Sequence, residues 1–86
     1  MVIEFDAAKD ASNQQKHGVS LAIAADFDWA TVLVAPARIE RGEVRLSVIG
    51  NVASEMYVAV VTERQGRMRI ISLRRANRKE RQKYGA

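Results

Sequence analysis

Basic side chains concentrate in the last quarter of the sequence and give it the character of a phosphate-binding surface. Residues 64–86 carry nine lysine and arginine side chains and one carboxylate, whereas residues 1–63 carry five basic and nine acidic side chains. The last segment therefore has a formal charge of +8 and the rest −4, in a chain of +4 overall. Such clustering predicts a nucleic-acid partner, because neutralised phosphates release counterions. A solvated basic face or a docking surface for an acidic protein would have the same composition.

Lys16 and His17 form a second group that could do chemistry. His17 is the only histidine, and an imidazole can gain or lose a proton near neutral pH, so it is a candidate general acid or base. Lys16 could contact a phosphate or a leaving group. Both residues also have a simpler interpretation, because they precede Gly18 at the expected end of a helix. There His17 could cap carbonyl groups and Lys16 could be a solvated lysine.

Local signals predict the elements that hold this pair. Residues 2–5 suit a short strand, and Asp6 suits the N-cap of a helix over 7–16 that stops at Gly18. This helix is polar, and we expect Ala8, Ala11 and Gln15 on its inner face. Ser20 is expected to cap a second helix over 21–27. Its apolar stripe consists of Leu21, Ala24, Ala25 and Phe27.

From residue 30 onward the pattern changes to strands. We predict strands over 31–35, 43–50, 56–63 and 67–75, with turns at Arg41-Gly42 and Gln65-Gly66. In the last strand, simple alternation places Arg69 on the side of Leu73 and Arg74 on the side of Ile70. Asn77 is expected to cap a closing helix over 78–84, because Glu80 three residues later completes a capping box.

These elements predict an α+β fold with two N-terminal helices, a mostly antiparallel sheet of about four strands and a short C-terminal helix. A chain of 86 residues is expected to be one domain, residues 1–86. Phe27 and Trp29, between helix and sheet, are expected in the core.

Several classes of protein are excluded by what the sequence lacks. It has no cysteine, one histidine and no glycine-rich phosphate loop, so we expect neither a cofactor nor a metal ion. No apolar run is long enough to span a bilayer, and the N-terminus does not resemble a signal peptide. We therefore expect a cytoplasmic protein without a membrane partner.

Three segments in a fixed order resemble the BrnT family of toxins. They are Asn13-x-x-Lys16-His17-Gly18-Val19, then Arg45 before Ile49-Gly50, then Arg67-x-Arg69-Ile70-Ile71-Ser72-x-Arg74-Arg75-Ala76, followed by Glu80 and Tyr84. The resemblance runs from Phe5-Asp6 to Tyr84. The sequence departs from the family pattern at two places. The connection around residues 35–43 is short, and Leu73 stands where a small residue is common.

The resemblance implies a RelE-like fold and a metal-independent ribonuclease that cleaves RNA and arrests translation and growth. It also implies a partner, a cognate BrnA-type antitoxin with a ribbon-helix-helix DNA-binding part. The complex of the two is expected to bind operator DNA and repress its own operon, so the toxin would meet DNA only through the antitoxin. The alternative is a non-catalytic basic module that binds nucleic acid or protein.

Metal-free RNA cleavage needs a group that takes the 2′-hydroxyl proton, cations that stabilise the phosphorane, and a proton for the departing 5′-oxygen. Arg45, Arg69 and Arg74 are the expected phosphate clamps. Lys16 and His17, with Glu80 and Tyr84 on the last helix, are the other catalytic candidates. Glu80 could equally cap the helix and balance nearby arginines, and Tyr84 could stack on a base or pack its ring under the sheet.

Five other basic side chains of the last quarter are expected to bind RNA, namely Arg67, Arg75, Arg78, Lys79 and Arg81. One or more of Arg45, Arg69 and Arg74 could instead pair with Glu63 or Glu55 across the sheet. For Arg67 and Arg75 such pairing is the favoured interpretation.

Overall fold

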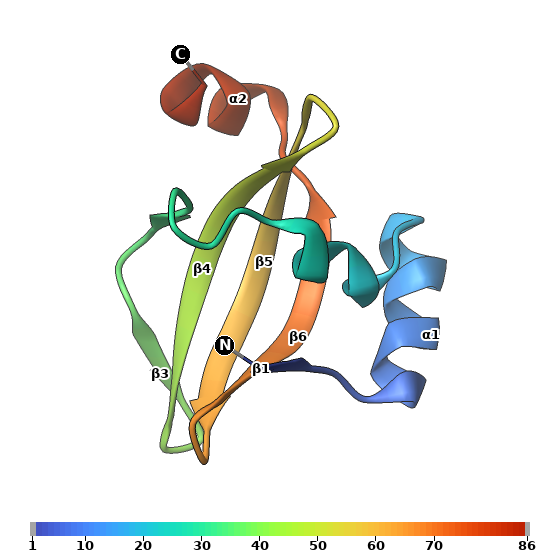
Figure 1. Cartoon of the computed structure of the whole chain (residues 1–86), viewed down its shortest axis with the longest axis vertical. Coiled ribbons are helices and arrows are strands. Elements are labelled where there is room, and N and C mark those ends of the chain that lie inside the picture. The colour runs from blue at the N-terminus through green and yellow to red at the C-terminus, as the bar shows by residue number, and fades with distance from the viewer. Residues whose placement is uncertain (1, 86) are drawn as a thin grey trace.

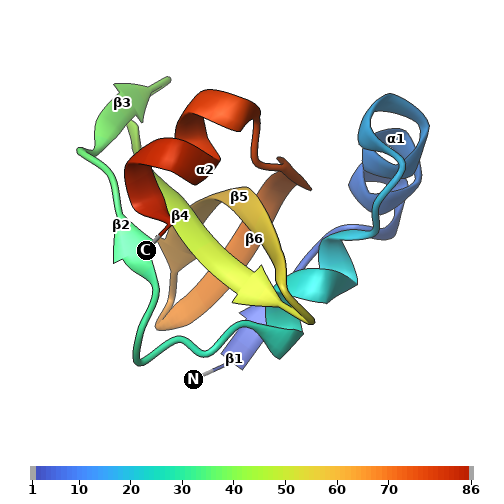
Figure 2. The same ribbon diagram turned by 90° about the horizontal axis from the view of Figure 1, so that it is seen from above.

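The computed structural model describes residues 2–85, which form one mixed sheet with helices at its edge and on both faces (Figures 1 and 2). The elements are β1 (Val2–Glu4), α1 (Ala7–His17), the 3₁₀ helix η1 (Leu21–Asp26), β2 (Leu33–Val34), β3 (Arg38–Glu40), β4 (Glu43–Val52), β5 (Glu55–Arg64), β6 (Arg67–Arg75) and α2 (Arg78–Tyr84). The predicted α+β class is confirmed.

The sheet is built on the antiparallel meander β4-β5-β6, to which three short strands are added. β1 pairs with β6 in parallel, and β2 and β3 both pair antiparallel with β4. The predicted strand over 31–35 is shorter than expected, and β3 was not predicted. Both predicted turns are present, with positive φ at each of their two residues, as type I′ hairpin turns require.

Helix α1 lies beyond the edge of β6 rather than over the sheet (Figure 2). Its predicted ends are confirmed, because Asp6 accepts a hydrogen bond from the Ala8 N–H at 2.7 Å and Gly18 ends the helix with φ of 71°. The predicted inner face was wrong: Ala8, Ala11 and Gln15 are exposed, and Asn13 is buried. A helix beside a strand edge meets backbone polar groups, so an amide suits the contact better than alanine does.

The second predicted helix is the 3₁₀ helix η1, capped by Ser20 as expected. Its buried side chains are Leu21, Ala24 and, just beyond its end, Phe27, while Ala25 is exposed. A spacing of three residues matches the three residues per turn of a 3₁₀ helix. The structure thus has one α-helix and one 3₁₀ helix where two α-helices were predicted.

A bulge in β6 changes which side chains share a face. Val60 pairs with Ser72 and Val61 pairs with Ile70, so Ile71 is an extra residue opposite β5. Ile70 and Leu73 are therefore both buried on one face, and Arg69 and Arg74 both lie on the other. The simple alternation expected from the sequence was wrong at this point.

Two apolar clusters cover the two faces. The larger one joins the sheet to η1 and includes Phe27, with Trp29 packed against it as predicted. The ring centroids of this aromatic pair are 5.6 Å apart. The smaller cluster lies under α2 and contains Ile49, Met56, Val58 and Ala76, with Tyr84 packed against it.

Gly50 permits the close packing of Phe27 against β4, and we predict that Gly50→Ala destabilises the fold. An added Cβ would lie 2.6 Å from the Phe27 ring, which forces an overpacked core and costs about 1 to 3 kcal/mol. Urea unfolding measures the loss. In a protein that already carries Phe27→Leu, the same Gly50→Ala change should cost less free energy of unfolding. An equal cost of Gly50→Ala with Phe27 and with Leu at this position would contradict the steric explanation.

Candidate functional site

The sheet face that carries α2 is only partly covered by that helix. The uncovered part, here called the open face, is formed by Arg45 and Ser47 of β4, Val60 and Thr62 of β5, and Arg69, Ile71 and Ser72 of β6. Figure 2 shows α2 over one face of the sheet and α1 beyond the edge of β6. The alternation of the strands, corrected for the bulge, places these side chains together.

Arg45 and Arg69 flank Thr62 in one row across the open face. Thr62 pairs with Arg69, and the register of β4 with β5 places Arg45 on the opposite side of Thr62. The two arginines are thus two strands apart, about 10 Å at a strand spacing of about 4.8 Å. Thr62 is 2 % exposed and donates a hydrogen bond to the Val44 carbonyl at 2.8 Å. The row can present two guanidinium groups to one anion above Thr62.

Carboxylates hold these two arginines to different degrees. Arg45 donates a hydrogen bond to Glu40 at 2.9 Å and lies 3.6 Å from Glu43. Arg69 lies 3.8 Å from Glu4 and 4.0 Å from Asp6, which is too long for hydrogen bonds. Arg69 can therefore exchange its partners for a phosphate more easily than Arg45 can.

Arg74 lies on the same face of the sheet, but it is distant from the arginine row and firmly paired with a carboxylate. It is five residues beyond Arg69 on β6, roughly 15 Å along the strand. Its guanidinium makes a bidentate pair with Glu80, at 2.7 and 2.9 Å. Glu80 also accepts from the Asn77 N–H at 2.9 Å and so completes the predicted capping box. The hydrogen bonds from Arg74 lower the pKa of Glu80 to about 2.

This pKa bears on the role of Glu80. A carboxyl group with a pKa of about 2 is ionised at neutral pH and is a weak base, because general-base catalysis works best when the pKa lies near the working pH. The structure therefore shows Glu80 as a helix cap and as the counter-ion of Arg74.

We predict that Glu80→Gln makes stability less sensitive to acid. The folded-state pKa is lowered from 4.5 to about 2, so the pair stabilises the fold above about pH 4.5 and this stabilisation is lost as pH falls toward about 2. Unfolding midpoints of both proteins across this range measure the effect. The curves should converge in acid, and a constant separation would contradict the prediction. Glu63→Gln, which removes an exposed carboxylate, is the control.

Lys16 and His17 are the last residues of α1 and lie beside the part of the open face formed by Ile71 and Ser72. Together with Ile71 and Ser72 they line a groove of about 350 Å³ between α1 and β6. Both side chains are exposed. Asn13, one helical turn before Lys16 and His17, contacts Leu73. Lys16 and His17 therefore lie beside the end of β6 that carries Arg74, at the level of Arg74 and not of Arg45.

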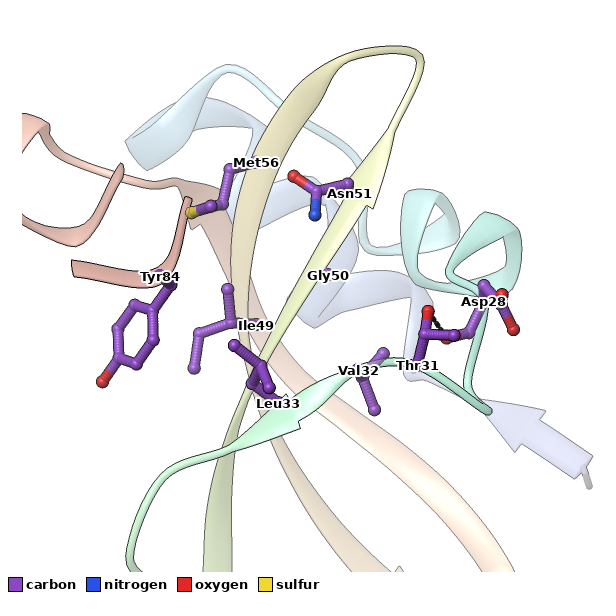
Figure 3. A pocket seen from close by; sticks show the side chains of 9 residues that line it. All are labelled: Asp28, Thr31, Val32, Leu33, Ile49, Gly50, Asn51, Met56 and Tyr84. Carbon is purple, nitrogen blue, oxygen red and sulfur yellow. Dashed lines mark hydrogen bonds between the residues drawn. The ribbon is translucent and has the colours of Figure 1, made fainter. Parts of the chain in front are cut away.

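Tyr84 lies away from the arginine row. Its ring packs against the cluster under α2 and lines a separate cavity of about 320 Å³ with Ile49 and Met56. Figure 3 shows its hydroxyl directed away from the other lining side chains. The structure therefore shows the packed ring that the sequence left open as an alternative.

The other basic residues of the last quarter are dispersed. Arg75 lies 3.5 Å from Glu55, as expected, and Arg67 lies 3.6 Å from Glu4 rather than from Glu63. Arg81 donates to the Ala76 carbonyl at 2.7 Å. Arg78 and Lys79 are exposed at the start of α2.

The structure thus separates most of the predicted catalytic residues into two groups. Arg45 and Arg69 form a row around Thr62 on the sheet, and Lys16 and His17 line the groove between α1 and β6 with Ser72. Arg74 belongs to neither group, because its guanidinium is paired with Glu80 of α2. Sequence reasoning missed Thr62 and Ser72. The only signal for them was the alternation of the strands, which the bulge obscures in β6.

Within residues 2–85, no group of three or more histidine, aspartate or glutamate side chains could hold a metal ion. In the same part of the chain no helix has the length and apolar character that a membrane crossing needs.

A comparison with known families identifies the class of this protein. The family described as the ribonuclease toxin BrnT of type II toxin-antitoxin systems matches residues 5–80. The matched segment includes both groups of basic residues and most of the 86-residue chain. The chain belongs to the BrnT family of ribonuclease toxins. No curated protein matches it in sequence. Membership of a type II family implies an antitoxin partner.

Proposed function

We propose that this protein is a metal-independent endoribonuclease with a RelE-like arrangement, and that its open face binds and cleaves single-stranded RNA. The observation that carries the proposal is the Arg45-Thr62-Arg69 row, in which two guanidinium groups flank one position on an uncovered sheet. Family membership supplies the reaction class.

In the proposed reaction the RNA 2′-hydroxyl oxygen attacks the adjacent phosphorus, and the bond from phosphorus to the 5′-oxygen breaks. The products are a 2′,3′-cyclic phosphate and a free 5′-hydroxyl. Arg69, with Arg45, stabilises the negative charge that develops on the non-bridging oxygens, since charge-assisted hydrogen bonds strengthen as that charge grows.

In the net reaction, the proton of the 2′-hydroxyl is transferred to the departing 5′-oxygen. His17 lies with Lys16 in the groove lined by Ile71 and Ser72, at the level of Arg74 and not beside the arginine row, and proton transfer needs hydrogen-bond reach of the reacting atoms. In this proposal Lys16 and His17 therefore contact the RNA chain beside the scissile phosphate. Glu80 acts indirectly by holding Arg74. Tyr84 has a packing role, because its ring lies in the cluster under α2.

The proposed partner is a BrnA-type ribbon-helix-helix antitoxin that neutralises the toxin in the cytoplasm and carries the complex to operator DNA. The sheet edge opposite α1 supports a protein partner there. It exposes large apolar side chains on β2, β3 and β4, namely Leu33, Val34, Ile39 and Val44. Titration with the antitoxin should abolish cleavage at a fixed stoichiometric ratio.

The test is cleavage of single-stranded RNA by the purified protein in EDTA. We expect cleavage that persists in the chelator and ends in cyclic phosphate. If RNA is bound in a salt-sensitive manner but remains intact, the protein is a non-catalytic binding module and the proposal fails. Restoration of cleavage only by added metal would refute metal independence.

A further inference from the structure

The groove between α1 and β6 contains polar residues that the proposed reaction does not use, namely Lys9, Ser12 and Ser72. Its lining residues are Lys9, Ser12, Asn13, Lys16 and His17 on α1 and Ile71 and Ser72 on β6. On a helix, positions 9, 12, 13 and 16 fall on one stripe. Two ammonium groups and a hydroxyl therefore face the strand along nearly the whole length of α1.

The groove is held open by two features already described. Asn13 fixes α1 to the strand edge through hydrogen bonds with both backbone groups of Leu73. The bulge at Ile71 places Ile71 and Ser72 together on the opposite wall. The groove joins the open face directly, since Ile71 and Ser72 belong to both.

The lysines of the groove differ from the arginines of the sheet in whether a carboxylate lies near them. Arg45, Arg69 and Arg74 each have a carboxylate within 4.0 Å, but among the described residues Lys9 and Lys16 have none. The position of Lys9 is also unfavourable for the helix itself. It lies in the first turn of α1, where the helix dipole disfavours positive charge. A favourable interaction with the helix dipole therefore explains why a lysine stands at position 16, in the last turn, but not why one stands at position 9.

We propose that this groove binds a phosphodiester of the RNA chain next to the scissile one, with Lys9 and Lys16 neutralising its charge and Ser12 and Ser72 donating hydrogen bonds to its non-bridging oxygens. This inference rests on the proposed function for the identity of the chain that is bound. It extends the RNA path from the arginine row to the N-terminal helix and adds Lys9, Ser12 and Ser72 to the binding residues.

The experiment measures binding of a 2′-O-methyl RNA oligonucleotide, which cannot be cleaved, by fluorescence anisotropy as salt is raised. For single strands the slope of log K against log salt changes by about 0.7 for each phosphate contact. We expect Lys9→Ala to make the slope less negative by about this amount, and Lys9→Arg to restore it. Lys83→Ala, which removes the same charge from α2, should leave the slope unchanged.

A stability readout separates binding from a structural role. Lys9→Ala should leave the unfolding midpoint unchanged or slightly raised, because it removes a charge that opposes the helix dipole. An unchanged slope in Lys9→Ala, or an equal change in Lys83→Ala, would overturn the groove proposal even if RNA is cleaved. If RNA is not cleaved but the Lys9 effect is seen, the groove stands and the ribonuclease assignment fails.

Discussion

Arg69→Ala is expected to lower kcat/KM for RNA cleavage by about 10² to 10³-fold, the usual cost of removing one group that stabilises an oxyanion. Arg69 is the less firmly paired member of the row, with its carboxylate partners at 3.8 and 4.0 Å. It can therefore turn to a phosphate without breaking a hydrogen bond. Single-turnover cleavage of a short RNA measures the effect on the chemical step.

Two further variants separate geometry from charge. Arg69→Lys keeps the charge but loses bidentate geometry, so we expect it to recover only part of the activity. Lys83→Ala removes one positive charge from α2 and should retain the activity of the unaltered protein. An Arg69→Ala protein that is folded and within about threefold of full activity would exclude Arg69 from transition-state stabilisation.

Asn13→Ala is expected to cost about 2 to 4 kcal/mol of folding free energy, because it leaves several buried polar groups without partners. The Asn13 amide donates to the Leu73 carbonyl at 2.7 Å and to the Val19 carbonyl at 2.9 Å. Its oxygen accepts from the Leu73 N–H at 3.1 Å. The side chain thus replaces a neighbouring strand at the edge of β6, beyond the end of β1.

Thermal unfolding measures this loss, which should lower Tm by roughly 10 to 20 °C in a domain of this size. Gln15→Ala, on the same helix, is the matched control, because Gln15 is exposed and was expected on the inner face. A loss below about 0.5 kcal/mol for Asn13→Ala, the range of ordinary surface substitutions, or an equal loss for Gln15→Ala, would contradict the role of Asn13.

Features set by neighbouring residues could be predicted from the sequence. Asp6 and Gly18 bound α1, and Asn77 with Glu80 begins α2, because a cap depends on residues within one turn. The hairpin turns follow from the same kind of local signal, as at Gln65-Gly66.

Features set by contacts between distant segments could not be predicted. The amide of Asn13 meets Leu73, which is 60 residues away, and no local pattern marks that contact. The bulge at Ile71 depends on how β6 pairs with β5, and without it Arg69 and Arg74 would lie on opposite faces. The arginines could be chosen from the sequence, but their grouping required the register of the sheet.

A double-mutant cycle on cleavage by Arg45→Ala and Arg69→Ala tests the central claim most directly. The two residues lie about 10 Å apart across β5, and side chains at that distance act independently unless they share a partner. If both bind one phosphate in the transition state, the combined loss in kcat/KM should differ from the product of the single losses by about fivefold or more. Losses that multiply within about twofold would show that the two guanidinium groups do not act on the same phosphate.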